Sequence, residues 1–442
     1  MPVEVDFGKY REALSQTSTI RISGKVARVI GLVVEGIGPD LSVGGICDIY
    51  PKTKGLPPVK AEVVGFSGNR ILMMPLGELR GIAPGCHIAM SRESATVRVD
   101  DSLLGRVIDA AGNPLDGKGP LLCRGERSLY ADPINPMTRA RIHKPLDVGI
   151  RAINGLLTIG MGQRIGIMAG AGVGKSVTLG MMAKNTTADV NVIGLIGERG
   201  RELREFIEKN LGDEGMRRSV VVVATSDQSP LLRVRGAYVA TTIAEHFRDR
   251  GKNVLLMMDS LTRYAMAQRE IGLSVGEPPA TKGYTPSVFA SLPRLLERAG
   301  TCAGKGSITG LYTVLIEGDD LAEPISDASR AILDGHIFLS RRLAGMNHYP
   351  AIDLLNSISR VMPDVTTPAH MKQANKFKEL YATYREAEDL INIGAYVKGS
   401  NARIDASVAK IDQMTQFLRQ GVEEKSEFAA SLAALTKIVG QG

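Results

Sequence analysis

Residues 164–177 have the sequence RIGIMAGAGVGKSV and carry the strongest structural signal in this chain. The apolar run at 165–168 predicts a short buried strand, and Lys175 and Ser176 begin a predicted helix. Three glycines lie between them, where backbone N–H groups can curl around a phosphate without side-chain clashes. A strand, a glycine turn and a helix in this order indicate a phosphate-binding loop, and therefore a nucleotide-binding protein.

The loop also predicts which groups contact the nucleotide. Lys175 is expected to reach the β- and γ-phosphates of ATP, and the Ser176 hydroxyl to bind Mg²⁺. The helix N-terminus adds partial positive charge toward a phosphate. The first position of the motif, most often glycine, is alanine here. The predicted nucleotide-binding residues of the loop are Ala169, Gly170, Ala171, Gly172, Val173, Gly174, Lys175, Ser176 and Val177.

Composition limits the class of protein. A chain of 442 residues is expected to fold as two or three domains. Aromatic residues make up only 5% and tryptophan is absent, which argues against a single-stranded nucleic-acid binder built on stacked rings. The net charge of +7 suits an acidic partner, nucleic acid or an anionic membrane, but solubility alone is the more frequent reason for a modest excess spread along the chain.

Cysteines and apolar runs bear on the compartment. The four cysteines form no CxxC pair and are expected to be free thiols: Cys47, Cys86, Cys123 and Cys302. Residues 1–17 contain charges and no long apolar core, so they predict no signal peptide. Because no run approaches the length of a membrane span, we expect a cytoplasmic protein.

The chain is predicted to have four parts. Residues 1–18 suit a short amphipathic helix, which either packs on the protein or binds a partner. Residues 19–100 contain short Val- and Ile-rich segments between turns, which predicts a small antiparallel β-barrel domain. Residues 101–365 alternate strands with helices, which predicts an α/β core with a parallel sheet. Residues 366–442 predict a helical C-terminal domain.

Individual elements can be placed within these parts. Barrel strands are expected at 20–22, 27–34, 59–64 and 70–74, followed by a turn-rich link at 103–119. Further core strands are expected at 192–196, 220–224, 254–258 and 308–316, and helices at 201–211, 236–250, 368–392, 406–421 and 424–439. Right-handed crossovers then place the phosphate-binding loop at the carboxyl edge of the sheet, where ligands bind.

Two acidic residues follow predicted strands. Asp259 follows the strand at 254–258, and a carboxylate there can hold Mg²⁺ through water. Glu198 follows the strand at 192–196. Its carboxylate can polarise the attacking water, or it can simply complement the dipole of the next helix, and chemistry alone leaves both roles open.

Arginines and tyrosines supply the remaining candidates. Arg199 can pair with a phosphate or make a salt bridge. Arg360 can reach the γ-phosphate of a neighbouring copy as an arginine finger. Chemistry alone admits three competitors for that role, Arg330, Arg341 and Arg342. Tyr349 and Tyr396 lie near proline and glycine turns, and they are either adenine stackers or core residues.

Four segments resemble the catalytic subunits of rotary ATPases, namely AGAGVGKS at 169–176, LIGERGRE at 195–202, LLMMDSLTRYAMAQREI at 255–271 and HYPAIDLLNSISRVM at 348–362. The resemblance covers nearly the whole chain and is closest to the ATPases of bacterial type III export, more specifically of flagellar export. The most specific segments are residues 276–300 and 325–344. This family implies a β-barrel, a RecA-like nucleotide domain and a helical C-terminal domain.

The resemblance also implies roles for residues. Lys175 would bind phosphate, Ser176 and Asp259 would support Mg²⁺, and Glu198 would be the general base. Arg360 would be the finger contributed to the adjacent subunit. The further implied contacts are Arg199 as a catalytic arginine, Tyr349 and Tyr396 as adenine neighbours, the loop 276–284 toward a coiled-coil stalk protein, and residues 1–18 toward a regulatory or stator protein.

Because Glu198 and Arg360 occur in one chain, a ring of identical copies can complete every site, which favours a homohexamer. The implied function is ATP hydrolysis that energises export of flagellar proteins at the cytoplasmic face of the inner membrane, with chaperone–substrate complexes and a membrane export gate as partners. The alternatives are a virulence-type export ATPase, the catalytic subunit of a proton-driven ATP synthase, an RNA-translocating helicase and a non-catalytic nucleotide-binding scaffold. We expect no nucleic-acid partner, because residues 19–100 show no interleaved aromatic and basic cluster.

Overall fold

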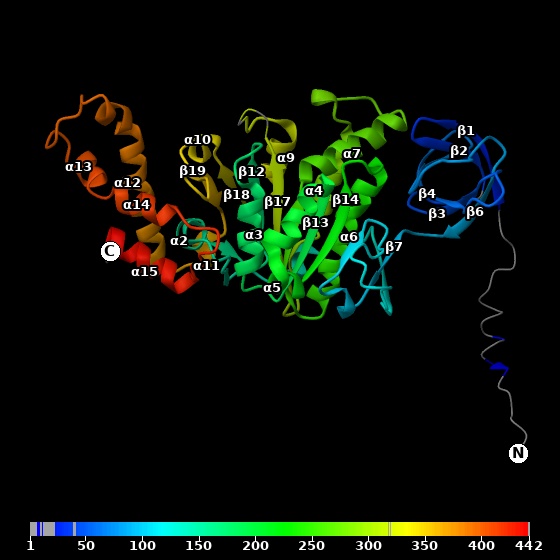
Figure 1. The fold of residues 1–442 in the computed structure, drawn as a ribbon, viewed down its shortest axis with the longest axis horizontal. Coiled ribbons are helices and arrows are strands. Elements are labelled where there is room, and N and C mark those ends of the chain that lie inside the picture. Colours follow the sequence, from blue (N-terminus) through cyan, green and yellow to red (C-terminus); the bar gives the residue numbers. More distant parts are fainter. Residues whose placement is uncertain are drawn as a thin grey trace, which may run out of the picture. The chain divides into compact units, whose positions relative to one another are not determined.

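The computed structural model describes residues 7, 8, 11, 23–38, 41–316, 318 and 320–440. The chain divides into two compact units (Figure 1). The first ends at Ala95 and also includes residues 274–276, and the second contains the other residues from Thr96 onward. The helix expected over 1–18 lies outside the described residues, apart from positions 7, 8 and 11. The four domain ranges given above stay predictions.

The first unit is a closed antiparallel barrel with strand order β1-β2-β5-β4-β3-β6. Its strands are β1 (Ser23–Ile30), β2 (Val33–Ile37), β3 (Ile46–Tyr50), β4 (Val59–Ser67), β5 (Arg70–Pro75) and β6 (His87–Arg92). Val34, Ile49 and Met73 are fully buried in its core. The predicted barrel is confirmed. The single strand expected at 27–34 is wrong, because the chain turns at Gly31, whose φ of +54° favours glycine.

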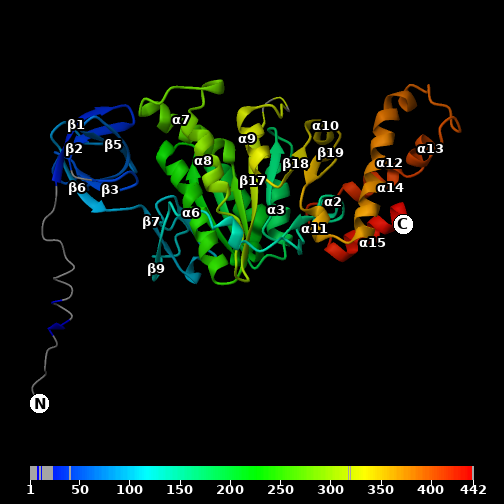
Figure 2. The same ribbon diagram turned by 180° about the vertical axis from the view of Figure 1, so that it is seen from behind.

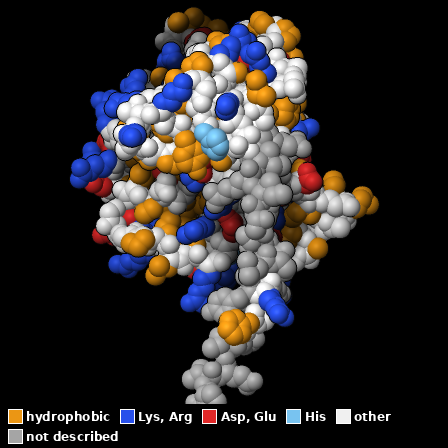
Figure 3. All heavy atoms as spheres, turned by 90° about the vertical axis from the view of Figure 1, so that its right-hand side faces the viewer, with side chains coloured by type: hydrophobic (Ala, Val, Ile, Leu, Met, Phe, Trp, Pro, Cys, Tyr) orange, Lys and Arg blue, Asp and Glu red, His pale blue; other side chains and the backbone are white. Residues whose placement is uncertain are grey.

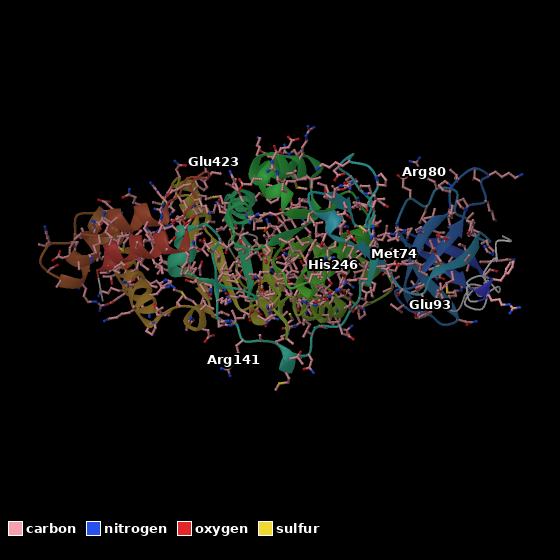
Figure 4. All side chains as sticks on the ribbon, turned by 90° about the horizontal axis from the view of Figure 1, so that it is seen from below. Met74, Arg80, Glu93, Arg141, His246 and Glu423 are labelled. Carbon is pink, nitrogen blue, oxygen red and sulfur yellow. The ribbon has the colours of Figure 1, made fainter. Side chains whose placement is uncertain are left out.

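Charge on the molecular surface follows the composition. On the face seen in Figure 3, Lys and Arg side chains are more prominent than Asp and Glu, as the net charge of +7 predicts. Arg80 is an example, because its side chain is 82% exposed and extends from the barrel unit (Figure 4). All four cysteines are free, as expected.

The second unit is built on a nine-stranded sheet with the order β19-β18-β12-β17-β15-β13-β14-β8, and with β16 paired to β17. Its strands are β8 (Val107–Asp109), β12 (Arg164–Ala169), β13 (Val190–Glu198), β14 (Ser219–Thr225), β15 (Asn253–Asp259), β16 (Gly300–Thr301), β17 (Ser307–Leu315), β18 (Gly335–Leu339) and β19 (Ile352–Ser359). The pairs β18–β19 and β16–β17 are antiparallel and the other neighbours are parallel. The predicted parallel α/β core is therefore confirmed.

Helices lie in front of this sheet when it is viewed from either side (Figures 1 and 2), which explains why its central strands are almost continuously apolar. The helices between β10 and β19 are α2 (Arg151–Leu156), α3 (Lys175–Asn185), α4 (Gly200–Glu205), the π-helix η3 (Phe206–Leu211), α5 (Gly212–Arg217), α6 (Pro230–Asp249), α7 (Leu261–Ser274), α8 (Pro286–Leu296), α9 (Pro324–Ile332) and α10 (Arg341–Gly345). Two short ladders accompany the sheet, β7 (Thr96–Val99) with β9 (Gly125–Ser128), and β10 (Pro145–Leu146) with β11 (Ile159–Gly160). Single 3₁₀ turns are η1 (Asp101–Leu103), η2 (Pro136–Thr138) and η4 (Thr281–Gly283).

Two expectations for this unit need correction. The segment 103–119 is more than a link, because its residues Val107–Asp109 form β8, which pairs with β14 at the edge of the sheet. The helix expected at 201–211 is two elements, since α4 passes into the π-helix η3 at Phe206.

The C-terminal region is helical, as predicted. Its helices are α11 (Met362–Val365), α12 (Pro368–Asn392), α13 (Ala402–Val408), α14 (Ile411–Leu418) and α15 (Phe428–Val439). The bounds of α12 match the prediction, because Thr367 caps the helix by accepting a bond from His370 N and Pro368 occupies its first turn. The helix expected at 406–421 is instead divided between α13 and α14. Phe377, Phe417 and Leu435 are buried in a core shared with α2.

Candidate nucleotide-binding and catalytic site

The phosphate-binding loop connects β12 to α3 at the carboxyl edge of the parallel sheet. Ala169, the last residue of β12, pairs with Leu315 of β17 and Leu339 of β18. The loop glycines Gly172 and Gly174 have φ values of +78° and +84°, a conformation that L side chains rarely adopt. A Cβ added at Gly172 would meet no atom within 4 Å, so the positive φ, and not crowding, is what favours glycine at this position.

Three predicted site residues meet beside this loop. Lys175 Nζ lies 2.5 Å from Asp259 Oδ1 and 3.4 Å from Glu198 Oε1. The two carboxylates come from the ends of β15 and β13, which are neighbours in the sheet. Burial by itself lowers the pKa of Lys175, but the charges of Asp259 and Glu198 outweigh it and raise that pKa. Lys175 is therefore a largely buried cation held between two carboxylates.

Glu198 has the electrostatics of a proton acceptor. Burial raises the pKa of its carboxyl group, the charge of Asp259 adds to this shift, and Lys175 opposes it. The side chain is 18% exposed, so water can still reach it. Its contact with Lys175 places the carboxylate at the loop, which favours the water-polarising role over the helix-dipole role.

The structure adds Thr313, which the sequence analysis did not single out. Its hydroxyl donates a 2.7 Å bond to Asp259 Oδ1 from the neighbouring strand β17. The side chain is fully buried, so the bond fixes the orientation of the carboxylate. The strand at 308–316 carries two threonines among apolar residues, Thr309 and Thr313, and the sequence alone does not show which of them faces Asp259.

The oxygen donors beside the loop fit a divalent cation. Ser176 lies in the first turn of α3, and the carboxylates of Asp259 and Glu198 are close by. Hydroxyl, carboxylate and phosphate oxygens are the ligands that Mg²⁺ prefers. Among the described residues, no group of three or more His, Cys, Asp or Glu side chains could hold a metal without such a phosphate.

Arg199 and Arg360 do not join this cluster within one chain. The Arg199 side chain is 71% exposed, and its nearest acidic partner is Glu202 at 3.6 Å. The guanidinium of Arg360 donates hydrogen bonds to the carbonyl oxygens of Leu333 and Arg330, each at 3.4 Å.

The strand register shows why Arg360 is remote from the loop. β19 runs antiparallel to β18, so Ser359 pairs with Gly335 at the opposite end from Leu339. Arg360 N donates to the carbonyl of Asp334, whose carboxylate accepts a bond from the N–H of Arg164 at the start of β12. Arg360 and the loop are therefore separated by the length of β12, roughly 16 Å of strand.

The three arginines that compete with Arg360 for the finger role lie at both ends of the parallel strands. Arg341 and Arg342 follow β18 at the edge that carries the loop, and Arg342 lies 3.5 Å from Glu388. Arg330 lies on α9 and offers its carbonyl oxygen to Arg360.

Tyr349 forms one wall of a cavity next to the loop. A Cβ on Gly174 would lie 3.4 Å from the Tyr349 ring, so the ring is close to the loop. The cavity has a volume of about 680 Å³. Its polar lining includes Arg151, Asp412, Thr415, Gln416, Arg419 and Gln420. These residues, mostly from the C-terminal region, were missed because the local sequence carries no nucleotide-binding motif.

Tyr396 lies elsewhere, between α12 and α13. Its hydroxyl lies 2.9 Å from Asp405 Oδ1 and 3.0 Å from the carbonyl oxygen of Asn401, and these two acceptors share its single proton. It does not line the cavity beside Tyr349.

Comparison with known proteins places this site in a family. A family model described as "ATP synthase alpha/beta family, nucleotide-binding domain" matches residues 149–359, and one described as "T3SS EscN ATPase C-terminal domain" matches residues 366–437. The flagellum-specific ATP synthase of Bacillus subtilis is 56% identical over 97% of this chain and 98% of its own length. This chain belongs to the ATP synthase alpha/beta family and, within it, to the flagellar and type III secretion ATPases.

Other members of this ATPase family are also similar to the chain over almost its full length. The type 3 secretion system ATPase of Xanthomonas euvesicatoria is 49% identical over 94% of this chain and 93% of its own length. The assembled ATPase EscN of enteropathogenic E. coli superposes with a TM-score of 0.89 at 44% identity, covering 94% of this chain and all of EscN. The structure of EscN with its central stalk EscO gives a TM-score of 0.87 at the same identity and coverage. The predicted family and enzyme class are confirmed. Within the part of the ATPase that the structure describes, no helix has the length and apolar character to cross a bilayer.

Proposed function

We propose that this ATPase hydrolyses Mg²⁺-ATP at sites shared between identical copies arranged in a ring. The observation that carries the proposal is the placement of Arg360 at the sheet edge opposite to the loop that holds Lys175. An arginine finger at that position serves the loop of a neighbour, and each copy then supplies half of two sites. A heterologous interface gives a ring where the rotation between neighbours closes, and we propose closure with six copies.

Each residue near the loop has a defined task in this proposal. The glycine loop and Lys175 bind the β- and γ-phosphates, while Ser176 and Asp259 hold Mg²⁺, which neutralises phosphate charge when bound. Glu198 accepts the proton of the attacking water. Arg199 exchanges Glu202 for a phosphate oxygen. Tyr349 stacks on adenine, and Tyr396 is not included because its hydroxyl is occupied by Asp405.

We further propose that hydrolysis energises export of flagellar proteins through the inner membrane. Higher identity to the flagellar relative than to EscN supports flagellar over virulence-type export. EscN assembles and binds a central stalk, which supports a ring and a stalk protein at the loop 276–284. A regulatory or stator protein at residues 1–18, chaperone–substrate complexes, an export gate and a location at the cytoplasmic face of the membrane complete the proposal.

The test is a mass measurement of the purified chain, with and without a non-hydrolysable ATP analogue, alongside ATPase rate against protein concentration. We expect a mass six times that of one chain, and specific activity that rises cooperatively as this species forms. Full specific activity from a single copy at every concentration would reject the shared site.

A further inference from the structure

Gln420 occupies a junction between three segments at the cavity beside Tyr349. It follows α14, and only 6% of its surface is exposed. Its backbone N–H donates a 2.9 Å bond to the carbonyl of Tyr349. Its side-chain Oε1 accepts a 2.8 Å bond from the N–H of Arg151, at the start of α2. Its Nε2 donates 2.7 Å bonds to the carbonyls of Gly149 and Glu424.

These bonds use the hydrogen-bonding groups of the Gln420 amide. A glutamine amide has two N–H donors and one carbonyl acceptor, and here both donors and the acceptor have backbone partners. No N–H of Gln420 is left to contact a nucleotide base. The bonds of Gln420 fix the spacing between Tyr349, the start of α2 and the segment after α14. Gln420 therefore acts on nucleotide binding indirectly, through the positions of these cavity-lining segments.

Neighbouring contacts connect the segment that holds Gln420 to α3, the helix that begins with Lys175. Arg151 forms an ion pair with Glu424 and donates a 3.3 Å bond to the carbonyl of Gln416. Glu423, which Figure 4 labels, lies 2.6 Å from Lys184 near the end of α3. The segment after α14 therefore contacts α2 and α3, the helix that begins with Lys175.

We propose that Gln420 is a positioning residue for the nucleobase of the substrate. It fixes Tyr349 and Arg151 in the lining of the cavity where we place the base, and it makes base binding depend on the placement of the C-terminal helices. This inference rests on the proposed function, since it assigns a task within the same nucleotide site. It predicts that Gln420 variants lose affinity for the base of the nucleotide and keep their affinity for its phosphates.

The experiment compares two probes that differ in the base. One is a non-hydrolysable ATP analogue, and the other is inorganic tripolyphosphate, which occupies the phosphate loop but has no base. Calorimetry on the full-length chain, with Mg²⁺, gives the Kd for each probe. The variants are Gln420→Ala and Gln420→Glu, of which the second keeps the side-chain shape and the acceptor for Arg151 N but loses the two Nε2 donors.

We expect both variants to raise the Kd for the ATP analogue and the KM for ATP by about tenfold, equivalent to about 1.4 kcal/mol, with kcat and the tripolyphosphate Kd unchanged. The control is Gln373→Ala, which removes a 3.1 Å bond between α12 and Thr436 of α15 without touching the cavity. It is expected to match the parent chain for both probes.

Three results would overturn the role of Gln420. These are an unchanged ATP-analogue Kd, equal weakening of both probes, and the same selective loss in Gln373→Ala. If Gln420→Ala fails to fold, Gln420→Glu alone decides between these outcomes. A parent chain that binds neither probe would instead reject the proposed nucleotide function, so the two failures are distinguishable.

Discussion

Arg360 and Lys175 lie at opposite ends of the strand β12: Lys175 beside its carboxyl end and Arg360 beside its amino end. Lys175 begins the helix that follows the carboxyl end of β12. Arg360 is bonded to Asp334, which in turn binds Arg164 at the other end of that strand. Because a packed sheet does not shorten, these two residues cannot meet on one phosphate within one copy. We infer that the working unit is a pair of neighbouring copies.

Replacing Glu198 by Gln tests the general base. The change keeps the shape of the side chain and removes its ability to accept a proton, so we expect kcat to fall by about 10²–10⁴-fold with ATP binding retained. Steady-state kinetics and analogue binding measure the two effects. The control is Glu205→Gln, an exposed residue paired with Lys209 on the surface, which should behave as the parent chain. Unchanged turnover in Glu198→Gln would remove it as the base.

The pH profile gives a second test of Glu198. Burial raises the pKa of this carboxyl group above its ordinary value of 4.5. The group accepts a proton only as the carboxylate, so activity is present above the raised pKa and is lost as the pH falls through it. We expect the acidic limb of kcat/KM to lie above pH 4.5, and a profile that stays flat down to that pH would contradict the assignment.

Thr313→Val tests how Asp259 is held. The substitution keeps the volume but removes the hydroxyl that donates to Asp259, so we expect the Mg²⁺ concentration for half-maximal activity to rise by roughly 3- to 10-fold. Thr309→Val on the same strand is the control, because Thr309 serves the N–H of Gly162 at the far end of β17. Equal Mg²⁺ dependence in the two variants would show that Thr313 does not orient the carboxylate.

The buried ion pair between Arg298 and Glu245 predicts a large effect on stability. Arg298 is 1% exposed, and its guanidinium contacts both oxygens of Glu245 at 2.9 and 2.5 Å. Arg298→Leu would leave a buried carboxylate unpaired, so we expect a loss of about 3–5 kcal/mol in the free energy of unfolding. Arg204→Ala, which breaks an exposed, solvent-screened pair with Glu208, should have a far smaller effect. Urea unfolding measures both, and similar losses would refute the distinction.

The loop and the carboxylates beside it could be predicted because their signals are local. A buried apolar run followed by an acidic residue placed Glu198 and Asp259 at strand ends, and the glycine turn located Lys175. The start of α12 could also be predicted from the sequence, since a threonine cap and Pro368 mark it.

The remaining features depend on contacts between distant segments. The position of Arg360 follows from the antiparallel direction of β19, which no local pattern reveals. The cavity beside Tyr349 is completed by Gln420 and its neighbours from a part of the chain without any nucleotide motif. The strand β8 is three residues long and lies between turns, so its hydrophobic pattern is too short to predict a strand.

Mixing two inactive variants tests the shared site most directly. Lys175→Ala removes the phosphate-binding lysine, Arg360→Ala removes the finger, and each variant alone should show almost no ATPase activity. In rings assembled from an equal mixture, about a quarter of the interfaces join an intact loop to an intact finger. We predict that mixing restores a measurable share of the parent ATPase rate, and that pre-formed rings that cannot exchange copies recover none. No recovery from rings shown to be mixed, or full activity of Arg360→Ala alone, would contradict the account.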